Sequence, residues 1–221
     1  KSTNAVCYLP LLAFPLAVVG FLDDLYNLSS GLRYTVQFAT AVFLVLASPL
    51  NFTWLMLPIL LIALTSVINF INFMDGMDGL VAGCMCVAIA VTAFHLSASL
   101  PLWTLVGGLF GFCFLNWSPA KVFMGDVGST FLGAVFVGLV LQSSNWFEAF
   151  GLLLVATPLL GDACFCALRR LVDGQRVFQA HRLHLFQRLH QVGWAHADVS
   201  ILYVAATFIL SVALLSGGLS W

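Results

Sequence analysis

Two neighbouring carboxylates stand where the first long apolar run of the sequence ends. They are Asp23 and Asp24, in the segment GFLDDLYNLSSGLR. At a membrane surface, two adjacent carboxylates repel one another unless a cation or a basic group relieves the repulsion. The pair is therefore a candidate for catalysis. The alternative is a solvated helix end, where exposed acids are common.

A polar seam follows in the segment NFINFMDGMDGL, where amide and acid side chains recur at every third position: Asn69, Asn72, Asp75 and Asp78. On a helix, each step of three residues displaces the side chain by about 60°, so the four groups drift slowly around one side. Gly76 and Gly79 permit a tight turn or a close approach to a ligand, and phosphate oxygens favour a helix start. A glycine-rich turn with asparagine caps would explain the glycines but not the polar series.

A third acid, Asp126, lies between Gly125 and Gly128 in the run FMGDVGS, just before another apolar segment. Aspartate often caps the start of a helix, which is one interpretation. The other is a ligand for Mg²⁺, because this ion usually takes one or two protein carboxylates while substrate phosphates complete its octahedron.

The longest hydrophilic stretch, residues 169–198, holds five of the eight basic residues and four of the five histidines. His181, Arg182, His184 and Arg188 would together suit an anionic diphosphate, because arginine matches the geometry of phosphate oxygens. A zinc site at His181 and His184 lacks a third ligand nearby. A basic patch for anionic lipid is the alternative.

The composition indicates that the segments which position these groups lie in a membrane. Hydrophobic residues make up 62% and charged residues 8% of the chain, and the mean hydropathy is +1.05. We predict an all-α fold, one polytopic membrane domain over residues 1–221. Its six cysteines lie in apolar segments, where thiols pack as small hydrophobes. About eight transmembrane spans are expected, at 5–22, 34–49, 53–72, 79–97, 101–117, 129–143, 147–168 and 199–216.

Eight spans would place the breaks 23–33, 73–78, 118–128 and 169–198 on one side of the membrane. All the basic residues except Lys1 fall on that side, which the positive-inside rule identifies as cytoplasmic. The acids gather there too, except Glu148, although acids contribute little to orientation. This concentration of carboxylates predicts a site in the cytoplasmic loops. The net charge of −1 gives no overall basic field that would indicate nucleic-acid binding.

The four segments, taken together and in this order, resemble the polyprenyl-phosphate N-acetylhexosamine-1-phosphate transferase family. The resemblance covers nearly the whole chain and includes Pro158 and Asp162 ahead of Arg169 and Arg170. The run HRLHLFQRL, at 181–189, is similar to the branch that initiates O-antigen and related surface glycans. The peptidoglycan branch instead carries a histidine-rich triplet there.

The resemblance implies transfer of a sugar-1-phosphate from a UDP-N-acetylated hexosamine to undecaprenyl phosphate, with release of UMP. It implies Mg²⁺ as the cofactor, with Mn²⁺ as a substitute, and a multi-pass protein of the bacterial inner membrane with a cytoplasmic active face. The implied partners are the UDP-sugar and the polyprenyl phosphate. A second copy of the chain, in a homodimer, is a further expected partner.

The residue-by-residue match implies a role for each acid of the site. Asp126 would bind Mg²⁺, with Asp24 as a second ligand, and Asp23 would deprotonate or orient the phosphate nucleophile of the lipid. Asn116 would contact the base. The other substrate-binding residues would hold the uridine end or the diphosphate, and they are Asn69, Asn72, Asp75, Asp78, His181, Arg182 and His184.

Two other classes of protein remain as alternatives. An ion-coupled transporter could use membrane-depth acids such as Asp162, but it usually keeps them near the midplane and in repeated halves. A lipid-binding scaffold would need the basic loop but not the aspartates. Because the chain starts at Lys1 and the family normally carries further spans before GFLDD, we interpret it as an N-terminally truncated fragment.

Overall fold

The computed structural model describes residues 3–175 and 183–217, and every regular element in these residues is an α-helix. The all-α prediction is confirmed. The helices are α1 (Thr3–Tyr26), α2 (Ser30–Leu46), α3 (Leu57–Phe73), α4 (Leu80–His95), α5 (Leu100–Asn116), α6 (Gly125–Val140), α7 (Trp146–Leu154), α8 (Thr157–Val172), α9 (Leu185–Gln191) and α10 (His196–Ser216).

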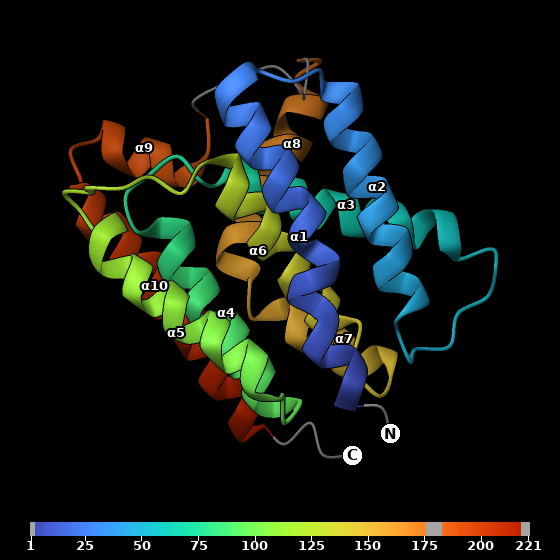
Figure 1. Cartoon of the computed structure of the whole chain (residues 1–221). Coiled ribbons are helices and arrows are strands. Elements are labelled where there is room, and N and C mark those ends of the chain that lie inside the picture. The colour runs from blue at the N-terminus through green and yellow to red at the C-terminus, as the bar shows by residue number, and fades with distance from the viewer. Residues whose placement is uncertain (1–2, 176–182, 218–221) are drawn as a thin grey trace.

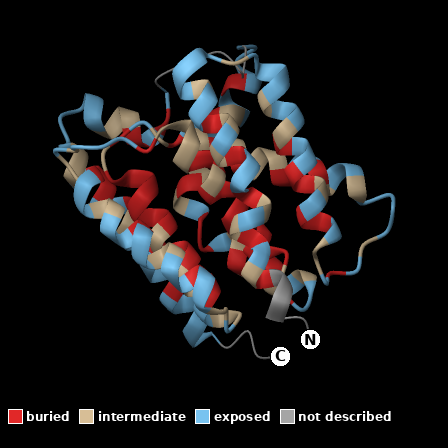
Figure 2. Ribbon diagram, viewed as in Figure 1, coloured by how far each residue is buried: buried red, intermediate tan, exposed pale blue. Residues whose placement is uncertain are grey.

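Helix α6 is the central element of the bundle. It packs against α1, α3 and α4, and also touches α2 and α7. From Ser129 to Val140 every residue except Phe131 is buried, as expected for a helix that is apolar on all sides. Figure 2 shows the buried residues concentrated along the inner sides of the helices. The helices that contact α6 therefore take their positions from it.

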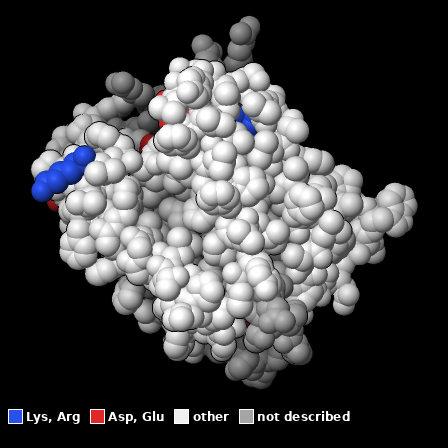
Figure 3. Space-filling model, viewed as in Figure 1, with Lys and Arg blue, Asp and Glu red and all other residues white. Residues whose placement is uncertain are grey.

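The remaining helices form two groups around this centre. Helices α4, α5 and α10 lie on one side of the molecule, and α2 and α3 lie on the other (Figure 1). Helix α10 packs along α4, and α8 packs against α3. Figure 3 shows that the visible face carries almost no charge below its upper part. An uncharged flank of this kind is suited to lipid.

The expected spans each correspond to helical segments, but their lengths differ from the prediction. Within the described residues, two helices are long and apolar enough to cross a membrane by themselves, namely Val6–Tyr26 of α1 and all of α10. The pair α7 and α8 would add a third if it counts as one span, and five further apolar helices are shorter, with 10–17 residues. By this criterion the number of eight is not reached. A helix of 16 residues is only about 24 Å long.

The expected span 147–168 is not one continuous helix. Helices α7 and α8 are bent by 86° at a short break. Pro158 occupies the first turn of α8, where its missing N–H is tolerated but where it could not continue a preceding helix. The hydrophilic stretch 169–198 is likewise not a simple loop, because it includes the end of α8, all of α9 and the start of α10.

Helix α9 is held to the bundle by one buried carboxylate of α8. Asp162 accepts hydrogen bonds from the backbone N–H groups of Leu185 (2.8 Å) and Phe186 (3.2 Å) and from the hydroxyl of Tyr203 (2.7 Å). Its side chain is only 4% exposed. The transporter alternative depended on this acid as an ion-path residue. In the structure it satisfies the first N–H groups of a short helix.

Helix α1 approaches the start of α6 without an intervening side chain. At Gly20, an added Cβ would lie 2.5 Å from the carbonyl oxygen of Asp126 and 2.6 Å from the nitrogen of Val127. Backbone atoms cannot move aside as the end of a flexible side chain can. The glycine of GFLDD is therefore required by this helix contact.

We expect Gly20→Ala to push α1 away from α6 and to lower the free energy of unfolding by about 1–3 kcal/mol, the usual cost of overpacking. Thermal unfolding of the purified protein in detergent would measure the effect. Gly111→Ala in α5 is the control, because a Cβ there meets no atom within 4 Å. Equal stability of the two variants would contradict the predicted clash.

We expect Asp162→Ala to release α9, because the N–H groups of its first turn lose their acceptor. Hydrogen exchange of the amides in residues 185–191 should become faster by about tenfold, a typical consequence of losing one or two hydrogen bonds. The matched control is Asp173→Ala in the same helix, whose side chain is 48% exposed and contacts Arg169 at 3.8 Å. If the amides of α9 exchange at the same rate in both variants, Asp162 does not hold α9 to the bundle.

Candidate active site

The acid pair at the end of α1 meets the start of α6. Asp24 Oδ1 accepts from the backbone N–H of Asp126 (3.1 Å), and Oδ2 accepts from the N–H of Val127 (3.3 Å). Gly125 has a positive φ of 65°, and a Cβ there would lie 2.5 Å from Asp24 Oδ2. The carboxylate thus caps α6 from another helix, at the positive end of its dipole. This contact fixes where the Asp126 side chain stands.

Arg33 of α2 joins the other two acids. Its Nη1 lies 2.7 Å from Asp23 Oδ2 and 3.2 Å from Asp126 Oδ2. Asp23 also accepts from the N–H of Leu28 at 2.7 Å, so both of its oxygens are engaged. One guanidinium therefore holds carboxylates from α1 and α6, and it supplies the basic group that the adjacent acids require.

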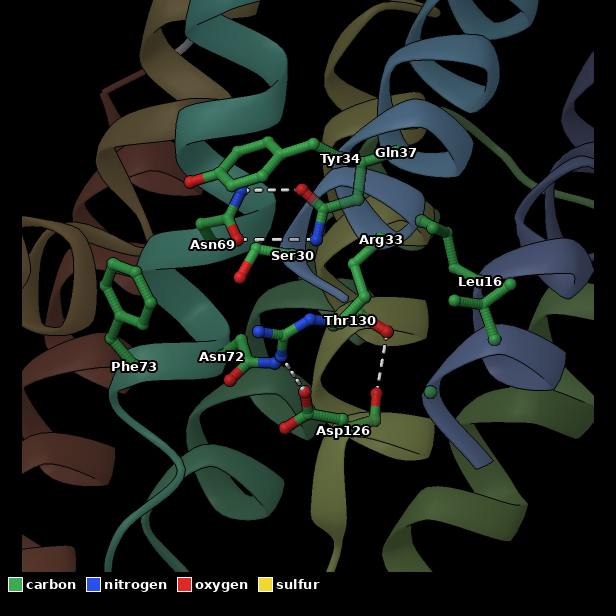
Figure 4. A pocket seen from close by; sticks show the side chains of 12 residues that line it. Leu16, Ser30, Arg33, Tyr34, Gln37, Asn69, Asn72, Phe73, Asp126 and Thr130 are labelled. Carbon is green, nitrogen blue, oxygen red and sulfur yellow. Dashed lines mark hydrogen bonds and ion pairs between the residues drawn. The ribbon is translucent and has the colours of Figure 1, made fainter. Parts of the chain in front are cut away.

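A cavity of about 340 Å³ opens beside this ion pair, between α1, α2, α3 and α6. Arg33 and Asp126 lie at one part of its wall and point toward each other (Figure 4). Across the cavity, Asn69 donates to Gln37 at 2.7 Å, and Gln37 donates in return at 3.3 Å. The remaining polar lining residues are Ser30, Tyr34, Asn72 and Thr130. Such a lining offers donors and acceptors to a polar ligand, with Leu16, Val19 and Phe73 completing the wall.

Asp75 lies within electrostatic reach of the same acids. The pKa of Asp75 is raised to about 7, mainly by burial and in smaller part by the negative charges of Asp126 and Asp24, while a backbone hydrogen bond from Gly125 opposes the rise. Arg33 contacts only two of these four carboxylates, Asp23 and Asp126, so the group as a whole carries an excess of negative charge. A bound cation among them would favour the ionised form of Asp75.

Asp78 and Asn116 make contacts between loops. Asp78 accepts from the N–H of Ala120 (3.2 Å), and its carboxylate lies 3.4 Å from Nδ1 of His196. Asn116 is buried, accepts from the N–H of Gly79 (3.1 Å) and donates to a carbonyl in the 117–124 segment. These contacts join the loops that follow α3 and α5. Neither residue lines the 340 Å³ cavity.

The predicted diphosphate-binding run is only partly described. His181 and Arg182 lie outside the described residues. His184 is buried beside Asp162, with 3.6 Å between Nδ1 and Oδ1, and its ring stacks on Phe186. It therefore contributes to the attachment of α9, and its predicted contact with the diphosphate stays a prediction.

The acids fit a magnesium ion that is shared with a substrate. No three histidine, cysteine or acidic side chains converge on a metal position within the part of the chain that the structure describes. Mg²⁺ needs only one or two protein carboxylates when phosphates supply other ligands. Asp126, with Asp75 near it, offers that donor set. Asp24 is less open as a ligand, because both of its oxygens already accept from α6.

Three functional candidates are apparent only in the structure. They are Arg33, which the sequence uses only for topology, Gln37, and His196, which in the sequence is one histidine of the basic stretch. The usable signal for Arg33 was its position as the first basic residue after the acid pair, on the same side of the membrane. Gln37 offers the weaker signal of an amide within an apolar helix.

Comparison with known proteins gives the family. The model of glycosyl transferase family 4 matches residues 6–144. The chain is 29% identical to a probable undecaprenyl-phosphate N-acetylglucosaminyl 1-phosphate transferase of Bacillus subtilis, over 95% of this chain and 65% of the relative. It is 34% identical to a phospho-N-acetylmuramoyl-pentapeptide-transferase of Carboxydothermus hydrogenoformans, over 61% of this chain and 43% of that protein.

A second phospho-N-acetylmuramoyl-pentapeptide-transferase, from Lactococcus lactis, is 32% identical over 57% of this chain. The chain thus spans less than two thirds of the length of these relatives. The family model nevertheless covers well over half of the chain, including the segments that carry Asp23, Asp24, Arg33, Asp75 and Asp126. The chain is therefore a helical membrane protein that belongs to glycosyl transferase family 4.

Proposed function

We propose that the protein transfers a sugar-1-phosphate from a UDP-N-acetylated hexosamine to a polyprenyl phosphate and releases UMP. The observation that carries the proposal is Arg33, which joins Asp23 and Asp126 at the wall of a polar cavity. In a member of this family, a cationic group held among carboxylates at the end of a helical bundle is suited to phosphate chemistry beside a lipid.

The reaction needs a nucleophile held in line with its target. An oxygen of the acceptor phosphate would attack the phosphorus atom that carries the sugar, forming a new P–O–P bond while the bond to UMP breaks. Arg33, which is 37% exposed, can offer its remaining N–H groups to the acceptor phosphate. Asp23 fits a positioning role through Arg33, because its two oxygens are engaged by Arg33 and Leu28.

Mg²⁺ is proposed to bind at Asp126, with Asp75 beside it and Asp24 as a further ligand. When bound, it would neutralise the charge of the diphosphate. The 340 Å³ cavity would bind the polar part of a substrate through the amides of Gln37, Asn69 and Asn72. Asp78, Asn116, His181, Arg182 and His184 keep their predicted substrate contacts as part of the proposal.

We also propose a specific sugar donor and a specific pathway. We assign a UDP-N-acetylhexosamine donor, undecaprenyl phosphate as the acceptor and initiation of O-antigen-type glycans, because His-Arg-Leu-His at 181–184 is similar to that branch. The relatives include both an N-acetylglucosaminyl 1-phosphate transferase and pentapeptide transferases of the peptidoglycan type by name. The proposed location is the bacterial inner membrane, with the active face in the cytoplasm.

Asp126→Asn should abolish magnesium-dependent release of UMP, with a loss of at least about 10²–10³-fold in rate. The fold should survive, because α6 is capped through the backbone N–H groups of residues 126 and 127, not through the Asp126 side chain. The assay uses purified protein in detergent, undecaprenyl phosphate, a panel of labelled UDP-N-acetylated sugars and Mg²⁺ or EDTA. If the variant formed labelled lipid at the wild-type rate, Asp126 would not be part of the active site. If the wild type transferred sugar phosphate from none of the donors, the proposed reaction would be refuted.

Arg33→Gln should lower kcat/KM for the acceptor by about 10²-fold, because Asp23 and Asp126 lose their shared cation. Arg33→Lys should keep part of the activity, since it retains the charge but loses the planar fork. Thr35→Ala, on the same helix, is the control, because the Thr35 hydroxyl is exposed and bonds only its own helix at Gly31. Full activity of Arg33→Gln would exclude the proposed role of the guanidinium.

A further inference from the structure

An open apolar groove runs along α4, α5 and α10, on the other side of the bundle from the candidate site. The part nearer the charged end has a volume of about 630 Å³, and its lining includes Cys86, Val87, Phe110, Trp117 and Lys121. Phe110 and Phe114 on its wall are 58% and 71% exposed. These exposed rings form apolar surface that a ligand with an apolar body could cover.

The groove continues toward the opposite end of the bundle. A second hollow of about 480 Å³ shares Cys86, Val87 and Phe110 with the first and extends to Trp103 and Phe208. Trp103 and Trp117 are 14 positions apart in the sequence, which corresponds to about 21 Å along a helix. One leaflet of a bilayer core is about 15 Å thick, so the groove is long enough for an acyl chain.

One end of the groove carries an unmatched positive charge. Lys121 is exposed in the segment between α5 and α6, and no carboxylate in the described residues lies within 4.0 Å of its ammonium group. Trp117 lies beside it in the lining, and tryptophan favours the level of lipid headgroups. The lysine, the tryptophan and the apolar channel together match the headgroup, the interface and the tail of an anionic lipid.

We propose that this groove binds an anionic phospholipid, with its phosphate at Lys121 and one acyl chain along α5 toward Trp103. A phospholipid fits better than the polyprenyl acceptor, because the acceptor phosphate must reach Arg33 and Asp126. Those two residues line the cavity between α1, α2, α3 and α6, which shares no lining residue with the groove. The groove is a separate surface, and only the choice of a phospholipid over the polyprenyl acceptor rests on the proposed function.

Native mass spectrometry of the purified protein, titrated with dioleoylphosphatidylglycerol or dioleoylphosphatidylcholine, tests the charge at Lys121. One phosphatidylglycerol should bind at concentrations where phosphatidylcholine does not. Lys121→Gln should weaken the binding of phosphatidylglycerol by about fivefold and leave the binding of phosphatidylcholine unchanged. This is the effect expected for one lysine that contacts an anionic headgroup. Equal affinity of the wild type for both lipids, or an unchanged preference in the variant, would overturn the proposal.

Two glycines of α5 test the channel independently of charge. Gly107 lines the groove and Gly111 does not, and a Cβ at either position meets no atom within 4 Å. Gly107→Leu should fill the groove and reduce phosphatidylglycerol binding at least fivefold, whereas Gly111→Leu should bind as the wild type does. Circular dichroism verifies that both variants fold.

The same titration distinguishes the source of the lipid. Undecaprenyl phosphate, added as a competitor, should not displace phosphatidylglycerol from the wild type. Displacement of phosphatidylglycerol from the wild type by an equal concentration of undecaprenyl phosphate would assign the groove to the acceptor and would overturn the phospholipid proposal. Equal binding by the two leucine variants would also overturn it.

Discussion

The candidate site depends on how the N-terminus of α6 is satisfied. The first N–H groups of a buried helix need acceptors, and here the acceptor is Asp24 of α1. That contact brings Asp23 and Asp126 close enough to share Arg33. It also requires Gly20 and Gly125, because a side chain at either position would enter the space between α1 and α6. One capping interaction thus links the first acidic motif to the third.

The same constraint explains why polar groups gather at one end of an otherwise apolar bundle. Within hydrocarbon, backbone groups must be satisfied inside helices, and irregular segments are restricted to the ends or to protected interiors. The loops after α3 and α5 join through Asn116, and α9 is held by Asp162. These polar side chains tie segments together, while Gln37, Asn69 and Asn72 face the cavity beside Arg33. The flank formed by α4, α5 and α10 is suited to contact with lipid.

Much of the architecture was predictable because hydropathy reports directly on a membrane environment. Apolar runs located the helices, and the charge distribution placed Asp23, Asp75 and Asp126 at a common end. Hydropathy could not locate the bend between α7 and α8, since both halves are apolar. It also missed α9, whose attachment depends on a carboxylate 23 residues earlier in the chain. Arg33 was missed because its partners, Asp23 and Asp126, lie 10 and 93 positions away.

Composition and motif order are enough to identify the helical membrane class and the chemically capable residues, because neither requires knowledge of packing. The separate roles of these residues become apparent only in the packed bundle. Asp24 caps α6, Asp23 holds Arg33, Asp78 contacts His196 and Asp162 anchors α9, although all four are aspartates near the ends of apolar runs. The physical reason is that the role of a carboxylate depends on which donors surround it. Those donors come from segments that meet only after the bundle has packed.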